Sequence, residues 1–235
     1  MGFIINSYRH AGEVIIHTTF DGTNEYVNCG SSIDFDYNDI FSFSGWVYVD
    51  AYNKVVISKL SSPQSRGFRF QVNSSGKLAF LLANTLSPAT NTLIVETTPT
   101  LSLGQWYNVG FSYDGSTNNS GVIFYIDGSS VAKDSPIANS LSSTTINTSD
   151  VLIGAQNSVS PAKFFDGKQD KLILYNDVVT AGEFSTIYNY GRKAGLIGIG
   201  NEVSQWEMDA LNPSDEIGSN DGTSANMDSN NIEVG

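Results

Sequence analysis

The sequence predicts an all-β fold, a sandwich of two antiparallel sheets with one short helix near residues 181–190. Apolar and polar residues alternate through most of the chain, and this period of two places successive side chains on opposite faces of a strand. Turn-forming residues interrupt the strands roughly every 8–12 residues, the spacing expected of a sandwich. Only 15% of the residues are charged, compared with about 25% in a typical domain. The polar surface must therefore come from Ser, Thr, Asn and Gly, which also favour turns.

The clearest single strand is residues 40–50, IFSFSGWVYVD. Phe41, Phe43, Val47 and Val49 share one face of this strand, because side chains two positions apart point the same way. The opposite face carries serines together with Trp and Tyr. The first face is therefore predicted to lie in the core between the two sheets.

Further strands follow along the chain and are joined by recognisable turns. Residues 67–82 form a predicted hairpin around NSSG at 73–76, and residues 105–127 form a second one that ends at Asp127-Gly128. Asp-Gly is a turn dipeptide whose residues accept a positive φ. The other predicted strands of the main body are residues 54–60, 91–97, 151–155 and 164–176.

The predicted helix follows the last of these strands. Thr180 and Glu183 form a T-x-x-E capping box, in which each side chain bonds a free backbone N–H of the first turn. Phe184, Ile187 and Tyr188 then form an apolar stripe on one side of the helix. We expect the helix to end at a glycine, either Gly191 or Gly195.

We divide the chain into three parts. Residues 1–19 form an N-terminal arm and first strand, residues 20–195 form the main sandwich, and residues 196–235 form a connector with a C-terminal strand at 203–209. This last strand either completes the sandwich of its own chain or docks on a neighbouring subunit. The sequence alone leaves both roles open.

Charge and cysteine content exclude several classes of function. The net charge is −12, with no cluster of Lys and Arg, whereas a nucleic-acid-binding protein needs a basic surface. The single cysteine, Cys29, excludes an internal disulfide and a thiolate metal cluster. There is no run of about 18 apolar residues, and the N-terminus lacks the features of a signal peptide. We therefore expect no nucleic-acid partner, no membrane partner and no signal-directed secretion.

Several short motifs occur in a characteristic order over residues 20–190. They are Phe20-Asp21-Gly22, Phe43-Ser44-Gly45-Trp46-Val47, Gly104-Gln105-Trp106-Tyr107-Asn108-Val109, Tyr125-Ile126-Asp127-Gly128, and Phe165-Asp166-Gly167 leading to Leu174-Tyr175-Asn176. In this order they resemble the laminin-G-like domains of the concanavalin A-like lectin class. The resemblance implies that the two antiparallel sheets form a jelly-roll sandwich.

One segment departs from the pattern of that family. A motif that normally precedes Phe-Asp-Gly lies here near the C-terminus, as Gln205-Trp206-Glu207-Met208-Asp209 followed by residues 218–223. This arrangement is similar to laminin-G-like proteins of tailed-bacteriophage virions. It implies a non-enzymatic structural or display protein of the virion, such as a capsid decoration, a head fibre or a tail component.

The same resemblance implies the partners and the location. We expect other capsid or tail proteins as partners, a homo-oligomer on the particle, assembly in the host cytoplasm, and binding of host or environmental glycans by the lectin-like domain. The alternative is a calcium-dependent carbohydrate-binding module of a larger secreted bacterial protein. A glycan array and copurification with particles would distinguish the two.

No catalytic or cofactor-binding residues are predicted. Glucanases of this fold place three carboxylates on alternate residues of one strand. Here only Glu207 and Asp209 fit, because the third position would be Leu211 or Asn212. The chain has only two histidines, both within its first 20 residues, and it contains no nucleophile elbow or phosphate-binding loop. The sequence therefore predicts a protein that is not an enzyme.

The resemblance also implies a structural Ca²⁺ near the Phe-Asp-Gly turn. The matching positions are Asp21, Asp166 and Asp170, and turns of this kind supply the oxygen ligands that calcium needs. The alternative is that these aspartates cap turns through their own side chains.

Sugar binding would need an exposed aromatic ring beside a few polar groups. The sequence does not show which rings are exposed, so no sugar-contacting residue is predicted. The available rings are Trp46, Tyr48, Tyr52, Trp106 and Trp206.

Overall fold

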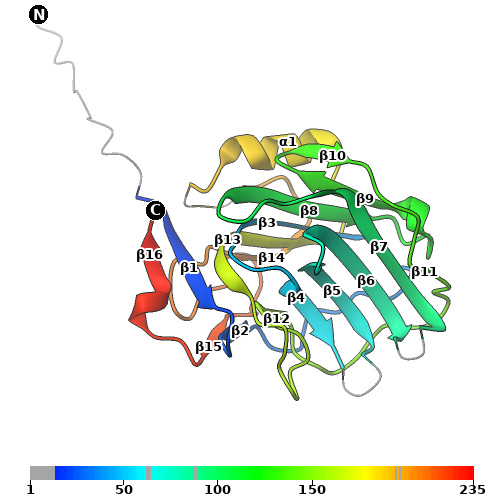
Figure 1. Ribbon diagram of the computed structural model, residues 1–235, viewed down its shortest axis with the longest axis horizontal. Coiled ribbons are helices and arrows are strands. Elements are labelled where there is room, and N and C mark those ends of the chain that lie inside the picture. Colours follow the sequence, from blue (N-terminus) through cyan, green and yellow to red (C-terminus); the bar gives the residue numbers. More distant parts are fainter. Residues whose placement is uncertain (1–13, 62–64, 87–88, 194, 196) are drawn as a thin grey trace, which may run out of the picture.

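The computed structural model describes residues 14–61, 65–86, 89–193, 195 and 197–235. These residues form two antiparallel sheets packed face to face, with one α-helix on the outside (Figure 1). The predicted fold class is therefore confirmed. Most of the predicted N-terminal arm lies outside the described residues. No helix in the described ranges is long and apolar enough to cross a membrane.

The first sheet, sheet A, is built around β3 and β13, which pair over most of their length. β14 (Glu202–Trp206) also pairs with β13, at the half that β1 leaves free. The order of the other strands is β10 (Ser129–Val131), β9 (Val122–Ile126), β8 (Trp106–Tyr113), β3 (Phe41–Val49), β13 (Asp166–Tyr175), β1 (Ile16–Asp21) and β16 (Ile232–Val234).

The second sheet, sheet B, has a row of longer strands in the middle and short strands at its edges. Its order is β11 (Ala138–Asn139), β7 (Asn91–Thr100), β6 (Lys77–Thr85), β5 (Gly67–Val72), β4 (Lys54–Leu60), β12 (Leu152–Ile153), β2 (Tyr26–Asn28) and β15 (Thr223–Ala225). Two 3₁₀ turns, Asn119–Gly121 and Ser229–Asn231, precede β9 and β16.

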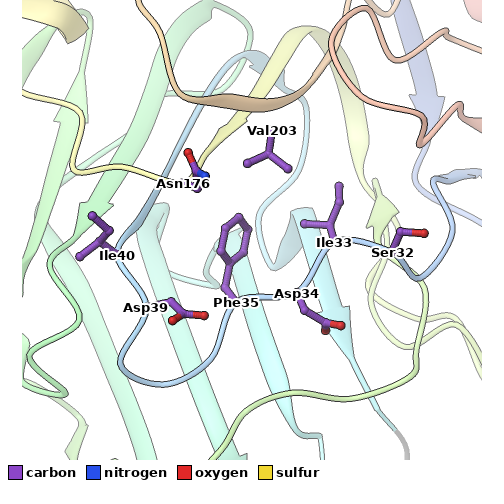
Figure 2. A pocket seen from close by; sticks show the side chains of 8 residues that line it. All are labelled: Ser32, Ile33, Asp34, Phe35, Asp39, Ile40, Asn176 and Val203. Carbon is purple, nitrogen blue, oxygen red and sulfur yellow. The ribbon is translucent and has the colours of Figure 1, made fainter.

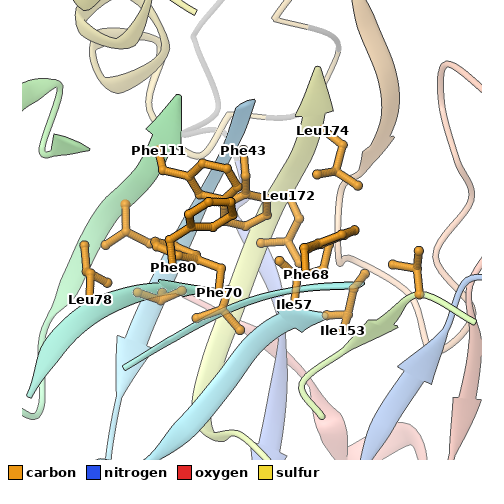
Figure 3. Packing of buried hydrophobic residues seen from close by; sticks show 14 of the residues in the cluster. Phe43, Ile57, Phe68, Phe70, Leu78, Phe80, Phe111, Ile153, Leu172 and Leu174 are labelled. Atoms are coloured by element: carbon orange, nitrogen blue, oxygen red, sulfur yellow. The ribbon is translucent and has the colours of Figure 1, made fainter. Parts of the chain in front are cut away.

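The core between the sheets is rich in phenylalanine (Figure 3). The four residues predicted from residues 40–50 to face inward are all completely buried. Phe43 of sheet A lies 5.3 Å, between ring centroids, from Phe70 of sheet B, and Phe111 lies 4.3 Å from Phe80. These offset rings supply both buried area and favourable aromatic geometry.

The predicted helix is α1 (Ala181–Tyr190), which lies on the outer face of sheet A (Figure 1). The capping box of Thr180 and Glu183 is present, and the helix ends at Gly191. Phe184 stacks on Tyr125 with the ring centroids 3.7 Å apart. The helix can come this close because Gly110 lies beneath Phe184: a Cβ at that glycine would come within 2.4 Å of the phenylalanine ring.

The C-terminal segment contributes strands to both sheets of its own chain. β14 pairs with β13, β15 with β2, and β16 with β1. The strand predicted at 203–209 ends at Trp206, since Met208 has a positive φ of 61°. Trp206 and Met208 both belong to the main core, and the Trp206 indole N–H donates to the Asn220 carbonyl at 2.9 Å.

Candidate functional site

The aromatic rings that the sequence offered as sugar platforms already pack against protein groups. Trp206 is fully buried, and the Tyr52 hydroxyl donates to the Leu101 carbonyl at 2.8 Å. Trp46 stacks on Tyr188 of α1, with 5.7 Å between the ring centroids. The remaining two rings, Tyr48 and Trp106, lie edge to face on the outer face of sheet A.

Trp106 is also covered by an arginine that follows α1. The Arg192 guanidinium carbon lies 3.9 Å from the Trp106 ring centroid, a cation–π contact. His17 of β1 packs edge to face with the same ring, with centroids 5.2 Å apart. The outer face of sheet A is therefore held together by its own residues around Trp106.

Beside this ring lies a group of charges that we call the Asp170 cluster: Asp170, Lys171, Arg192, Glu207 and Asp209. Arg192 Nη1 lies 3.7 Å from Asp170 Oδ2, and Lys171 Nζ lies 3.2 Å from Glu207 Oε2. Burial raises the pKa of Asp170 to about 8, and the negative charges of Glu207 and Asp209 act in the same direction.

The Asp170 cluster contains the third carboxylate that sequence reasoning missed. That reasoning looked along one strand, at positions 211 and 212, whereas the structure places Asp170 of the neighbouring β13 beside Glu207 and Asp209. The hollow at this place has a volume of about 100 Å³, whereas ligand pockets usually measure about 300–1,000 Å³. Through the ion pair of Lys171 with Glu207 and the contact of Arg192 with Asp170, the cluster fastens residues on both sides of β14 to β13.

The three aspartates expected to hold calcium do not form one group. Asp21 and Asp166 face each other in register at one end of sheet A, but Asp170 lies four residues further along β13 and contacts Arg192. Lys54 Nζ donates to the Gly22 carbonyl at 3.2 Å and lies 3.9 Å from Asp166 Oδ2. An ammonium group thus occupies the space between two of the oxygens that a cation would need.

Asp21 behaves as the alternative interpretation expected, since its Oδ1 accepts a hydrogen bond from the Thr23 backbone N–H at 2.8 Å. In the described part of the chain, no three Asp, Glu, His or Cys side chains converge as metal ligands. The residues present at the Phe-Asp-Gly turn therefore do not fit a calcium ion.

A more open pocket lies beside the loop between β2 and β3 (Figure 2). We call it the 32–40 pocket; its volume is about 430 Å³. Figure 2 shows the Phe35 ring pointing toward Val203 of β14 and flanked by Ile33 and Ile40. The Phe35 ring is only 6% exposed and stacks on Phe41 of the core, whereas Ile40 is 42% exposed. The polar residues around it are Ser32, Asp34, Asp39 and Asn176.

The two carboxylates of the 32–40 pocket are held in place by other parts of the chain. Lys59, buried under the loop, lies with its Nζ 2.8 Å from Asp34 Oδ1 and donates to the carbonyls of Ser31 and Ile33, both at 2.7 Å. Asp39 Oδ2 accepts a hydrogen bond from the Asp36 N–H at 2.8 Å. The pocket thus combines an apolar floor with pre-positioned acceptors.

The family of the chain follows from comparisons with known proteins. A laminin-G-type family model, described as the concanavalin A-like lectin/glucanases superfamily, matches residues 21–185. No curated protein matches the sequence. The fold is similar to that of a Bacteroides ovatus protein described as carbohydrate-binding, with a TM-score of 0.62 and 13% identity over 94% of this chain.

This chain spans only 60% of the length of the Bacteroides protein. It also resembles the native heptameric SAP-like pentraxin of Limulus polyphemus, with a TM-score of 0.60 and 16% identity over 94% of both chains. At these identities the two structures support the fold alone, whereas the family model covers more than half of the sequence. The chain therefore belongs to the concanavalin A-like lectin/glucanases superfamily, through its laminin-G-like β-sandwich.

Proposed function

We propose that this chain is a non-catalytic carbohydrate-binding domain that holds an uncharged sugar in the 32–40 pocket. The observation that carries the proposal is the combination of the apolar side chains of Ile40 and Val203 with the acceptors Asp34 and Asp39 in a pocket of about 430 Å³. The pocket is lined by four apolar and four polar residues, and its size lies within the range of small-ligand sites. The lectin-like fold supports the same function.

The chemistry of the pocket suits a neutral sugar. A pyranose ring presents C–H groups that pack on Ile40 and Val203, and hydroxyls that donate to carboxylate oxygens. Ionised acceptors form stronger hydrogen bonds than neutral ones. Two carboxylates in a protein of net charge −12 would repel an acidic sugar at this place.

A binding role is better supported than catalysis. Glycoside hydrolysis needs a carboxyl group that stays protonated to act as the acid. Asp170, with its pKa raised to about 8, belongs to the Asp170 cluster on the outer face of sheet A. At the 32–40 pocket, Asp34 is instead paired with the Lys59 ammonium.

The test is a glycan array followed by calorimetry on the best neutral ligand. Asp39→Asn keeps an acceptor for the Asp36 N–H but removes the charge, so we expect about tenfold weaker binding. Glu216→Gln removes an equal charge from an exposed position outside the pocket and should leave the affinity unchanged. Equal affinity in both variants, or no neutral glycan bound at all, would refute the proposal.

The role on a bacteriophage virion stays a prediction. The described C-terminal strands all pair within their own chain, so docking on other virion proteins would have to use a different surface. Copurification of the chain with particles would support this role and the expected oligomer. A monomer that binds glycans reversibly would favour the alternative, a module of a larger secreted protein.

A further inference from the structure

A second polar site lies on the outer face of sheet B. None of its residues lines the 32–40 pocket. Its centre is Arg69 of β5, which stands in register between Ser58 of β4 and Leu81 of β6. The Arg69 Nη1 donates to the side chain of Gln156 at 2.6 Å. Its Nε is buried and has no hydrogen-bond partner. The guanidinium is thus hydrogen-bonded through Nη1, whereas its buried Nε–H has no acceptor.

A second cation lies close to Arg69. Lys163 directly follows Ala162, which forms a β-bridge with Gln156. The backbone carbonyl of Lys163 accepts a hydrogen bond from the Val55 N–H. Burial lowers the pKa of Lys163, and the nearby charge of Arg69 lowers it further. Burial also lowers the pKa of Arg69, to about 10.

Neither cation has a carboxylate partner among the described residues. This is notable in a chain with 24 acidic and only 12 basic residues. A partly buried cation beside a like charge costs free energy, because desolvation and repulsion both disfavour the charged form. Perturbed titratable groups of this kind cluster at binding sites, where a ligand relieves the cost.

The surroundings of the two cations suit a sugar. Gln71 lies two residues beyond Arg69 on the same face of β5, and its side-chain Oε1 is buried without a hydrogen-bond partner. Next to Arg69 lies a small apolar cluster on this side of the sheet, buried at its centre and partly exposed at its edge. It consists of Leu60, Leu81 and Ala83, with Leu86 and Ile94 beside them.

We propose that the outer face of sheet B binds a carboxylated sugar, such as a hexuronic acid, with the carboxylate between Arg69 and Lys163. The planar guanidinium offers parallel N–H donors that match a carboxylate. The Gln71 Oε1 accepts a sugar hydroxyl, and the ring packs on the partly exposed Ile94, which stands in register with Leu81. A single carboxylate suits this site better than a polyanion, because the net charge of −12 repels a highly charged chain.

The experiment compares digalacturonic acid with its neutral counterpart, the galactose disaccharide of the same linkage, by calorimetry on the full chain. We expect the acidic disaccharide to bind at least tenfold more tightly, and its affinity to fall as salt is added. Inorganic phosphate is the third probe. Equal affinity for the two disaccharides, or tighter binding of phosphate than of the acidic sugar, would overturn the proposal.

Three variants locate the site. Arg69→Gln should weaken binding of the acidic disaccharide at least tenfold, and Lys163→Gln several-fold. Lys193→Gln removes an equal charge from an exposed position just after α1 and should change nothing. Unchanged binding by Arg69→Gln would refute the site.

A stability measurement separates binding from folding. Because Arg69 is unsatisfied in the free protein, the ligand-free Arg69→Gln variant should melt at the same temperature as the parent or above it. Arg69→Lys keeps the charge without the planar donors and should bind with intermediate affinity. Asp39→Asn should leave binding of the acidic sugar unchanged, so the two sites can fail independently.

Discussion

Asp170 shows how a single buried carboxyl couples the outer face of sheet A to pH. Its side chain is only 3% exposed, and the positive group nearest to it, Arg192 Nη1, is 3.7 Å away. The Asp170 pKa is raised to about 8, first by desolvation and then by Glu207 and Asp209, although Arg192 and Lys171 oppose the shift. The folded protein therefore keeps this group protonated at neutral pH.

The stability of the protein should fall as the pH rises through the Asp170 titration. Between about pH 4 and pH 8 the folded state retains the proton, whereas the unfolded state, with a pKa of about 3.9, releases it. Asp170→Asn cannot ionise. Its free energy of unfolding relative to the parent should grow by on the order of 1 kcal/mol per pH unit in this window.

Urea unfolding at several pH values between 5 and 8 measures this difference. Glu216→Gln, at an exposed position, serves as the control and should follow the parent. If the profiles of Asp170→Asn and the parent run parallel, Asp170 is already ionised in the folded protein.

At the scale of elements, α1 shows how local signals and tertiary packing act together. The capping box begins the helix at Thr180, and Gly191 ends it with a φ of 77°. Phe184 and Ile187 are buried against sheet A, whereas Tyr188, expected in the same stripe, is 38% exposed and lies over Trp46. The apolar stripe of α1 therefore extends beyond the buried contact with sheet A, and Tyr188 at its margin covers the Trp46 ring.

Removal of the cap should destabilise the whole sandwich, because α1 covers buried residues of sheet A. We expect Thr180→Ala to lower the free energy of unfolding by about 1 kcal/mol, which is roughly 2–4 °C in melting temperature for a chain of this size. Glu183→Gln keeps an acceptor for the Thr180 N–H and should have a smaller effect. Thermal unfolding checks both, and equal melting temperatures for Thr180→Ala and the parent would contradict the role of the cap.

At the scale of the whole molecule, the C-terminal segment closes the sandwich. Val234 of β16 stands in register with Ile16 of β1, and the Gly235 N–H donates to the Ile15 carbonyl at 2.8 Å. The two strands are antiparallel neighbours, so the end of β16 lies beside the start of β1 (Figure 1). The C-terminal segment could therefore precede β1 in the sequence and still occupy the same place in the fold.

A circular permutant tests this expectation. The permutant begins with residues 202–235, continues through a short Gly-Ser linker, and ends with residues 14–201. We expect it to fold, with a melting temperature within about 5 °C of the parent. A chain that ends at 201 without the transfer loses Trp206 and Met208 from the core and should not unfold cooperatively. A permutant that aggregates, or a truncated chain as stable as the parent, would contradict the closing role.

Much of the fold could be predicted because it depends on local pattern. Period-two alternation placed Phe41, Phe43, Val47 and Val49 in the core, and the Asp127-Gly128 turn has a positive φ at both residues, as expected. The ends of the individual strands were harder to predict. Only Leu152–Ile153 of the predicted strand 151–155 forms a ladder, because strand ends depend on which neighbour supplies hydrogen bonds.

The candidate sites could not be predicted in the same way. The bulge at Lys171, which has a φ of 47°, shifts the register of β13 between Asp170 and Ile173. Such a shift decides which side chains reach the outer face, and alternation alone does not reveal it. The expected calcium set failed to converge for a related reason: Asp21 of β1 stands opposite Asp166 of β13, whereas Asp170 lies four residues further along β13 beside Arg192.

By itself, the sequence determined the two-sheet sandwich, the inward faces of its main strands, the helix with its cap, and the family. Those properties follow from backbone geometry over a few residues. Three features became visible only in the folded chain: the C-terminal strands close their own sandwich, Asp170 lies beside Glu207 and Asp209, and Lys163 lies beside Arg69. These contacts join residues that are far apart in the chain. Each contact depends on the register in which the strands pair, and that register is set only when the whole chain folds.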